Sequence, residues 1–312
     1  MGHKYLIAAV SLVFLATSCG PTKNQKKEEE PAVAVSSFNS GFGGGIYFDT
    51  KESYARLDLR TGSVENFLAS DRNMTSASVQ GDGFVTVKRS KTYPEVLVLN
   101  RSKDAIVRIA LPENPAGTPK LSRNGELVIV GGIAGDTKIF NLKGEMVENL
   151  HANVASYDWL TDGRVIFSRF GTLYITEADF KSYKVFRTLH GAPNSVTVSP
   201  DGGRIAFSML QLGIPHIWVM DLSGTLRQVT TSTVGENFPA WSPDGNHIVL
   251  AKGKVTLKGE PNCLELWVVN ANSEAVNNLN SEDLANTFRV QQNVSGQISE
   301  TCAVAAPTWR AE

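Results

Sequence analysis

The residues best suited to acid–base or metal chemistry in this chain are its histidines, and they are widely separated. The sequence contains His3, His151, His190, His216 and His247. Imidazole changes its charge near neutral pH and is a common metal ligand, so closely spaced histidines would indicate a site. No such spacing occurs. A site gathered from distant parts of the chain stays open, although a lone histidine is more often structural or merely exposed.

No catalytic motif accompanies these histidines. The sequence has no Gly-x-Ser-x-Gly turn, no His-Glu-x-x-His helix and no phosphate-binding Gly-Lys-Ser/Thr loop. The glycine-rich residues 41–45 precede no helical pattern and are predicted to form an entry loop or a turn. The formal net charge of −1 provides no basic excess for nucleic acid. We therefore predict no catalytic residue, no bound metal and no cofactor.

Two nearly identical segments reveal the elements that position the side chains. Ser199-Pro200-Asp201-Gly202 and Ser242-Pro243-Asp244-Gly245 lie 43 residues apart, and each precedes an alternating apolar segment. Proline presets the turn, aspartate bonds its own backbone and glycine tolerates a positive φ, so these aspartates are predicted to be structural. Further apolar segments follow each copy, and the outermost are residues 226–230 and 276–279. A unit of about 40 residues with four short strands is typical of one β-propeller blade.

The same period runs through the rest of the chain. The turn glycines that mark it are Gly45, Gly83, Gly125, Gly163, Gly202 and Gly245. They are separated by 38, 42, 38, 39 and 43 residues, and an apolar strand follows each of them. Six markers predict an all-β fold, a six-bladed propeller of four-stranded antiparallel blades.

The C-terminus is predicted to close this ring. The first blade has no clear inner strand before Gly45, whereas Ala306-Pro307-Thr308-Trp309 matches Phe238-Pro239-Ala240-Trp241. A C-terminal strand added to blade one would leave no unpaired edge at the ring junction. The alternative is a frayed tail that happens to contain a tryptophan.

The turns and strands of residues 193–270 resemble the WD40-like repeats of the TolB-type six-bladed propeller. The resemblance rests on the Ser-Pro-Asp-Gly turns, on Ile217-Trp218-Val219-Met220-Asp221-Leu222 and on Arg227-Gln228-Val229-Thr230-Thr231. Partial copies occur at residues 122–125 and 160–163. This chain has no room for the α/β domain that precedes the propeller in TolB, so the resemblance is to the repeat.

Residues 1–18 resemble a bacterial lipoprotein signal peptide. Lys4 precedes the apolar residues 5–14, and Leu15-Ala16-Thr17-Ser18-Cys19 resembles the cleavage box. On this interpretation Cys19 becomes the lipid-modified N-terminus, and Gly20 in place of an aspartate favours the outer membrane, with the protein facing the periplasm. The alternative is an ordinary secretory signal.

The polar residues 19–40 are predicted to be a flexible tether with a span of about 25 Å, and residues 41–312 are predicted to form the propeller.

The two other cysteines are predicted to form a disulfide. Cys263 and Cys302 both lie in insertions of the last blade, and an even pair in an oxidising compartment is typically bonded. The alternative is two buried free thiols.

Long, irregular connections are predicted to gather on one face and to form the binding side. They are residues 88–94, 209–215, 252–262 and 281–304. Two of them are basic and supply the candidate binding residues Lys88, Arg89, Lys91, Lys252, Lys254 and Lys258. They favour an acidic partner, although a solvated lysine face without a function is the alternative.

These observations favour a binding module over an enzyme. We expect a monomeric, lipid-anchored envelope protein whose propeller binds protein partners or a ligand. The alternative is a propeller enzyme resembling the metal-dependent oligogalacturonate lyases, which would gather histidines and a metal at the axis.

Overall fold

The apolar alternation of the repeats appears in the structure as short antiparallel strands. The computed structural model describes residues 42–50, 53–69, 74–80, 83–88, 90–92, 94–100, 102–133, 136–152, 154, 156–253, 263–280, 287–294, 297–303 and 306–311. The chain divides into the units Met1–Ser36 and Ser37–Glu312, and all described residues belong to the second. None of the described residues forms a helix long and apolar enough to cross a membrane.

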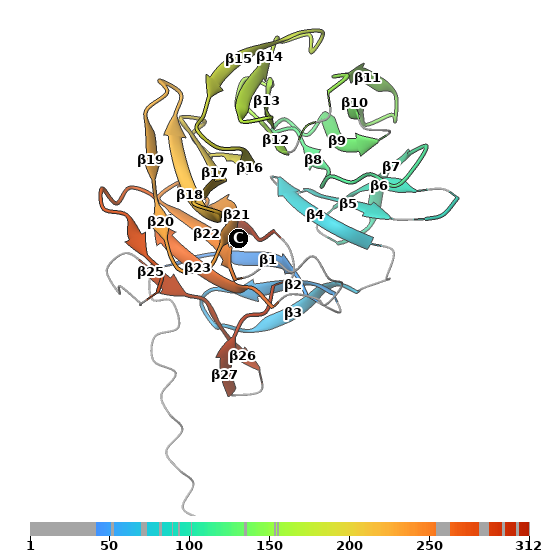
Figure 1. The fold of residues 1–312 in the computed structure, drawn as a ribbon. Coiled ribbons are helices and arrows are strands. Elements are labelled where there is room, and N and C mark those ends of the chain that lie inside the picture. The colour runs from blue at the N-terminus through green and yellow to red at the C-terminus, as the bar shows by residue number, and fades with distance from the viewer. Residues whose placement is uncertain are drawn as a thin grey trace, which may run out of the picture. The chain divides into compact units, whose positions relative to one another are not determined.

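Six four-stranded antiparallel sheets follow one another around a ring (Figure 1). Each is named here from its inner strand a to its outer strand d. Blade 1 consists of β28 (Thr308–Arg310), β1 (Gly45–Asp49), β2 (Ser53–Asp58) and β3 (Val64–Ala69). Blade 2 consists of β4 (Met74–Gln80), β5 (Gly83–Lys88), β6 (Glu95–Leu99) and β7 (Ala105–Ala110). Blade 3 consists of β8 (Lys120–Leu121), β9 (Leu127–Ile133), β10 (Asp136–Asn141) and β11 (Met146–Asn149).

The second half of the ring has the same order. Blade 4 consists of β12 (Ser156–Trp159), β13 (Val165–Arg169), β14 (Thr172–Thr176) and β15 (Tyr183–Thr188). Blade 5 consists of β16 (Pro193–Val198), β17 (Arg204–Gln211), β18 (Ile214–Asp221) and β19 (Leu226–Gln228). Blade 6 consists of β21 (Glu236–Trp241), β22 (His247–Lys252), β23 (Glu265–Asn270) and β25 (Thr287–Arg289). The predicted all-β, six-bladed propeller is confirmed.

The core lies between the blades. Six buried apolar clusters occur among the described residues, and each joins two neighbouring blades. Ile166 of blade 4 packs with Val198 of blade 5, for example, and Val249 of blade 6 packs with Ile46 of blade 1. Apolar burial stabilises by roughly 25 cal/mol per Å², so each blade depends on both of its neighbours.

The C-terminal strand closes the ring, as predicted. β28 pairs antiparallel with β1, and Trp309 lies opposite Ile46. Trp309 is 7% exposed and belongs to the cluster that joins blades 6 and 1. The alternative of a frayed tail is therefore wrong.

Two details of blade 6 differ from the prediction. Residues 276–279 were expected to be its outer strand, but β24 (Asn277–Asn278) instead pairs in parallel with β20 (Thr230–Thr231), next to blade 5. The outer strand is β25, which lies inside the predicted loop 281–304. That loop also contains a hairpin of β26 (Gln291–Val294) and β27 (Gln297–Glu300). Leu279 is fully buried in the cluster of blades 5 and 6, so burial between blades outweighs the local strand pattern.

Two local predictions are also corrected. Residues 209–215 are not an irregular loop, because β17 and β18 extend through them to a pair between Gln211 and Ile214. At the start of blade 1, Gly44 rather than Gly45 has the positive φ, at 87°. Gly45 is the first residue of β1 and lies opposite Arg310 of the closing strand.

Candidate functional site

Antiparallel pairing gives the propeller two different faces. The a–b and c–d connections lie on one side, here called the turn face. The b–c connections and the d–a connections between blades lie on the other side, here called the loop face. Residues 170–171 form the b–c connection of blade 4, and residues 212–213 form that of blade 5.

The aspartate turns of the turn face are occupied by their own hydrogen bonds. The Ser199 hydroxyl donates to Asp201 at 2.5 Å, and the Gly203 backbone N–H donates to the same carboxylate at 2.9 Å. The Ser199 hydroxyl bond, together with this backbone bond, holds the pKa of Asp201 below its usual value. Ser242 and Asp244 repeat the arrangement at 2.5 Å. These carboxylates therefore stabilise turns, as predicted.

An arginine bridges two non-adjacent blades on this same face. Arg123 lies in the a–b turn of blade 3, and its guanidinium donates to the carbonyls of Val198, Ser199 and Pro200 in blade 5, at 3.1, 2.8 and 3.1 Å. Internal hydrogen bonds of Asp201, Asp244 and Arg123 thus help to hold the turn face together.

The structure places the four described histidines in separate surroundings. His151 is exposed, and its Nδ1 lies 3.7 Å from Asp136. His190 packs edge-on against Trp218, with ring centroids 5.2 Å apart. His247 packs against Phe42 at 4.8 Å on the turn face, and burial lowers its pKa. Within the described ranges, no three His, Cys, Asp or Glu side chains are grouped to hold a metal.

His216 belongs to a buried polar cluster that the sequence analysis missed. Its Nδ1 lies 2.5 Å from the Glu236 carboxylate, and Glu236 is fully buried. Ser232 and Thr230 also donate to this carboxylate. His216 is in β18 of blade 5 and Glu236 begins β21 of blade 6, so the cluster joins two blades. In a catalytic triad the histidine lies between the serine nucleophile and the carboxylate. Here the Glu236 carboxylate lies between Ser232 and His216, so these residues do not form such a triad.

Asp49 is another unusual carboxyl on the loop face. It is the last residue of β1 and lies opposite the buried Tyr54. Burial raises the pKa of Asp49 to about 6. Burial also raises the pKa of Tyr54, with a smaller contribution from the Asp49 charge. Burial thus disfavours the charged form of both neighbouring groups.

The predicted basic loops are only partly within the described residues. Lys88 ends β5 opposite Glu95, and Lys91 is exposed in the loop that follows. Lys252 is half-buried, donates to the Leu279 carbonyl and lies 4.6 Å from the centre of the Trp267 ring, so its charge serves the packing of blade 6. The other three candidates, Arg89, Lys254 and Lys258, lie outside the described residues. The basic binding face stays a prediction.

The predicted disulfide is present in the structure and lies on the loop face. Cys263 and Cys302 are bonded, with their Cα atoms 4.7 Å apart. Next to them, Leu264 and Ala303 exchange backbone hydrogen bonds of 2.8 and 3.0 Å. The bond therefore ties strand c of blade 6 to the segment that leads to the closing strand.

The most exposed apolar residues of the loop face are at two hairpin tips. Phe170 is 87% exposed and Leu212 is 101% exposed. Each is followed by glycine in a two-residue turn, and both turn residues have positive φ: 46° and 78° in blade 4, 51° and 87° in blade 5. This is a type I′ turn, which favours Asn-Gly and disfavours a bulky first residue. An apolar residue before glycine between two strands is the sequence signal that could have revealed them.

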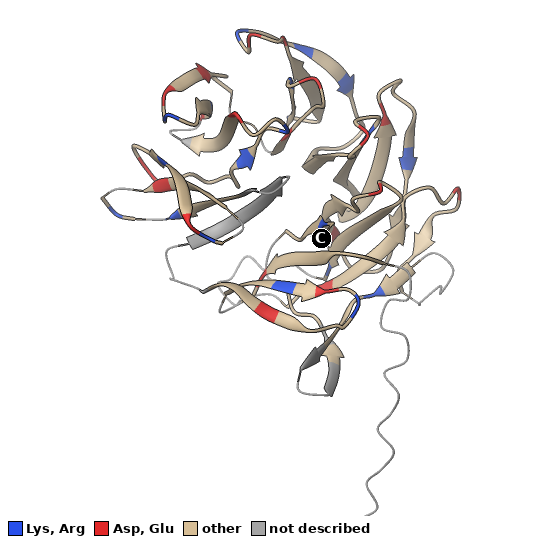
Figure 2. Ribbon diagram, turned by 180° about the vertical axis from the view of Figure 1, so that it is seen from behind, with Lys and Arg blue, Asp and Glu red and all other residues tan. Residues whose placement is uncertain are grey.

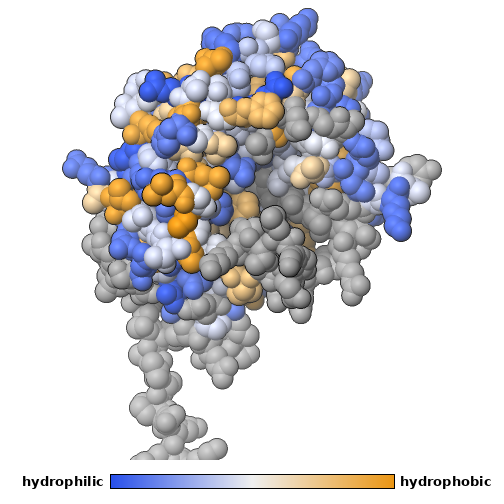
Figure 3. All heavy atoms as spheres, viewed as in Figure 1, coloured by the Kyte–Doolittle hydropathy of each residue, from blue (hydrophilic) through white to orange (hydrophobic). Residues whose placement is uncertain are grey.

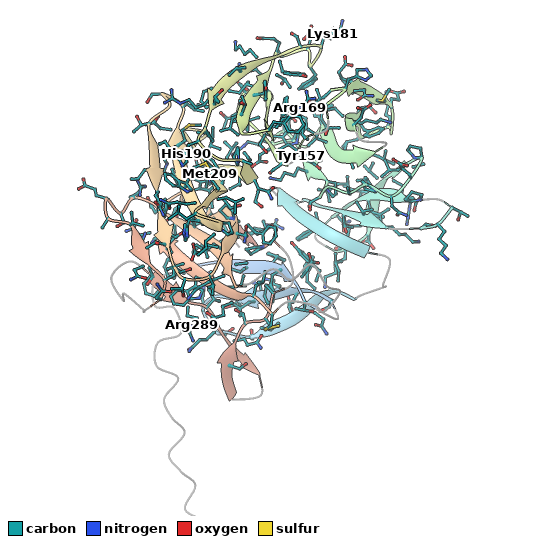
Figure 4. All side chains as sticks on the ribbon, viewed as in Figure 1. Tyr157, Arg169, Lys181, His190, Met209 and Arg289 are labelled. Atoms are coloured by element: carbon teal, nitrogen blue, oxygen red, sulfur yellow. A yellow bond between two sulfur atoms is a disulfide. The ribbon has the colours of Figure 1, made fainter. Side chains whose placement is uncertain are left out.

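The d–a connection between blades 4 and 5 lies between the two tips. The Leu189 backbone N–H donates to the Gly171 carbonyl at 2.9 Å. A Cβ on Gly191 would come within 2.9 Å of Met209, so this connection packs closely on the end of β17. Figure 4 shows His190 and Met209 side by side where blade 4 leads into blade 5, with Arg169 at the end of β13 in blade 4. Phe170, Leu212 and His190 thus belong to one continuous surface.

Apolar and charged side chains are distributed differently over the ring. Figure 3 shows apolar residues gathered on the left of that view, over blade 5 and its neighbours. In Figure 2, basic and acidic positions are interspersed around the blades. A concentrated field of one sign therefore does not distinguish a site, whereas the exposed apolar tips do.

Comparisons with solved structures show the same fold. TolB from Acinetobacter baumannii matches with a TM-score of 0.64 and 18% identity, covering 86% of this chain and 67% of that one. A putative TolB from Agrobacterium tumefaciens matches with a TM-score of 0.58 and 15% identity, covering 85% and 92%. A protein from Lactobacillus plantarum matches with a TM-score of 0.51 and 14% identity, covering 86% and 99%. No protein-family model matches the sequence, and no curated protein matches it.

Proposed function

We propose that this chain is a protein-binding scaffold of the bacterial cell envelope. The observation that carries the proposal is that Phe170 and Leu212, the two most exposed large apolar side chains among the described residues, both lie on the loop face. On the turn face, Asp201, Asp244 and Arg123 form hydrogen bonds within the propeller. The loop face exposes Phe170, Leu210 and Leu212, which are 87%, 53% and 101% exposed. Exposed apolar side chains of this size are typical of protein-interaction surfaces.

The fold supports this proposal without naming a partner. The structural neighbours are TolB-type propellers, with identities of 18% and 15%. A shared fold at this identity does not transfer function, so the proposal rests on the loop face.

The envelope location and the anchor are proposed from the sequence. Residues 1–18 would direct export, Cys19 would carry the lipid and residues 19–40 would tether the propeller at the outer membrane. All of these lie outside the described residues. The disulfide between Cys263 and Cys302 supports an oxidising compartment.

Site-specific photocrosslinking in intact cells tests the scaffold function. A photoreactive phenylalanine analogue would replace Gln211 on the loop face or Asn246 on the turn face, both of which are exposed. We expect a crosslinked adduct of discrete mass from position 211 and a much weaker one from position 246. If neither position, nor a wider scan of the loop face, gives an adduct and the native protein elutes alone, the scaffold proposal is wrong.

The metal-dependent lyase has no specific support in the described residues. The histidines that such a site would collect are instead found against Trp218, against Glu236 and against Phe42. We do not propose it as a second function.

A further inference from the structure

The side chains of Phe170 and Leu212 at the tips of blades 4 and 5 gain little from folding. A Phe or Leu side chain stabilises a protein when it leaves water, and Phe170 and Leu212 stay 87% and 101% exposed. Their backbones also have φ values of 46° and 51°, which a bulky side chain disfavours. Phe170 and Leu212 are therefore in a backbone conformation that is unfavourable for their side chains. Asparagine at the same positions would be more favourable, because Asn-Gly is the preferred pair in a type I′ turn.

The tips belong to one surface with a defined centre. We call the exposed residues Phe170, His190, Leu210 and Leu212 the tip surface. The connection that carries His190 is fixed at one end by the hydrogen bond from Leu189 to the Gly171 carbonyl. At the other end it packs against Met209 and the Leu210 carbonyl. The two apolar tips are therefore held on either side of His190 by packed backbone.

The charge around the tip surface is positive or absent. The segments that form it and its surroundings are residues 168–172, 188–193, 209–215 and 231–236. Their one carboxylate is Glu236, which is fully buried against His216. The guanidinium of Arg169 lies 5.2 Å from the centre of the Phe170 ring, at the base of one tip. The Nε of Arg169 is buried and has no hydrogen-bond partner in the described part of the chain.

We propose that the tip surface binds a segment of a partner protein in which apolar side chains stand next to carboxylates. This proposal rests on the scaffold function and names its surface and the chemistry of its partner. The apolar side chains would pack on Phe170 and Leu212, and a carboxylate would pair with Arg169. Arginine suits this role because its fork matches a carboxylate while its plane stacks on an aromatic ring.

A protein fits these features better than a lipid surface. Attraction to an anionic membrane grows with each basic residue near it, and the described tip segments supply a single arginine. The first described residue, Phe42, packs against His247 and Trp309 on the turn face. Phe42 therefore lies on the side of the propeller opposite the tips.

Peptide selection on the purified full-length protein provides the test. A phage-displayed library of random peptides would be selected on it, and synthetic versions of the enriched peptides would be titrated by fluorescence anisotropy. The main variant is Phe170→Asn with Leu212→Asn, which gives both turns the preferred Asn-Gly pair and is expected to melt at or above the wild-type temperature. The matched control is Ile106→Asn with Val185→Asn, two residues on outer strands that are 60% and 59% exposed.

We expect enriched peptides that combine apolar residues with Asp or Glu. The tip variant should weaken their binding by about tenfold or more, as is typical of central apolar contacts, and the outer-strand control should leave it unchanged. Arg169→Gln should reduce the dependence of binding on salt.

Three results would overturn the proposal in different ways. Peptides that bind the tip variant as tightly as the wild type would place binding elsewhere and leave the scaffold function intact. Sedimentation with phosphatidylglycerol vesicles that is lost in the tip variant, without any tip-dependent peptide, would make the surface a membrane contact. Failure to recover any peptide would exclude this partner chemistry, and the crosslinking at position 211 would still decide the scaffold function.

Discussion

The indole of Trp309 donates a hydrogen bond of 3.2 Å to the carbonyl of Gly43, across 266 residues of sequence. Two other inner strands use tryptophan in a related way. Trp159 of blade 4 donates to Lys120 of blade 3 at 3.0 Å, and Trp241 of blade 6 donates to Thr197 of blade 5 at 3.3 Å. In blades 4 and 6 the tryptophan of the inner strand thus bonds to the preceding blade, whereas the Gly43 acceptor of Trp309 leads into β1 of blade 1 itself. At blade 1 this bond joins the two ends of the propeller.

The first prediction concerns this closure. Trp309→Ala should lower the free energy of unfolding by roughly 3–5 kcal/mol, because a buried tryptophan leaves a cavity and a carbonyl loses its donor. Urea unfolding followed by circular dichroism measures it. Leu212→Ala is the control, since that side chain is 101% exposed and should change stability by less than about 0.5 kcal/mol. Equal stabilities of the two variants would contradict the closure by β28.

The second prediction concerns the disulfide. Cys263→Ser with Cys302→Ser should destabilise the propeller by roughly 3–4 kcal/mol, since the bond closes a loop with a sequence separation of 39. Non-reducing peptide mapping of protein isolated from the envelope should recover the Cys263–Cys302 pair. Two free thiols in that material, or a wild type whose melting temperature does not respond to a reductant, would count against the bond.

The third prediction uses the pH dependence of Asp49. Burial raises its pKa to about 6 from 3.8, so the folded state binds more protons than the unfolded state between these values. Stability from this group is therefore lost as the pH rises through that range. Asp49→Asn should stabilise the protein at about pH 7.5 by up to roughly 3 kcal/mol, and the difference should shrink at about pH 4.5. A difference that does not depend on pH would refute the assignment.

The fourth prediction concerns the buried pair of blades 5 and 6. Glu236→Ala leaves His216 without its partner and should cost about 3–5 kcal/mol in the free energy of unfolding. Glu177→Ala is a matched control, because Glu177 pairs with Lys184 at 3.2 Å with side chains 47% and 63% exposed. The exposed pair should contribute less than about 1 kcal/mol. Similar losses in both variants would show that the buried pair is not a specific link between the blades.

The fifth prediction concerns the proposed anchor. Cys19→Ser should move the protein from the membrane fraction to the soluble periplasmic fraction or leave the signal segment uncleaved, because the acyl chains cannot be attached. Labelling of growing cells with a palmitate analogue should mark the wild type and not the variant. An unlabelled wild type would favour the ordinary secretory signal.

Turn motifs and the spacing of the repeats were sufficient to predict much of the fold. The Ser-Pro-Asp-Gly turns predicted the aspartate bonds of Asp201 and Asp244, because turn chemistry involves neighbours in sequence. The repeat spacing predicted six blades, and the match of residues 306–309 to residues 238–241 predicted the closing strand. Cys263 and Cys302 could be paired because they were the two cysteines left after Cys19.

Other features depend on contacts between blades. Residues 276–279 have an acceptable strand pattern, yet the outer strand of blade 6 is β25, because Leu279 is buried between blades 5 and 6 instead. The sequence does not indicate that His216 meets Glu236, since this pairing depends on how β18 packs against β21. Leu212 was not recognised as a hairpin tip because residues 209–215 were expected to be an irregular loop, and Phe170 was not singled out from the sequence.

The sequence by itself therefore determined the repeat, the turn geometry, the number of blades and the strand that closes the ring, since all of these follow from local conformation and from periodic apolar residues. Only the tertiary structure decided which face exposes the apolar tips. The physical reason is that exposure is a property of packed neighbours. Phe170 resembles any strand-end aromatic residue in the sequence, and only the folded chain shows that it is 87% exposed in the turn between β13 and β14.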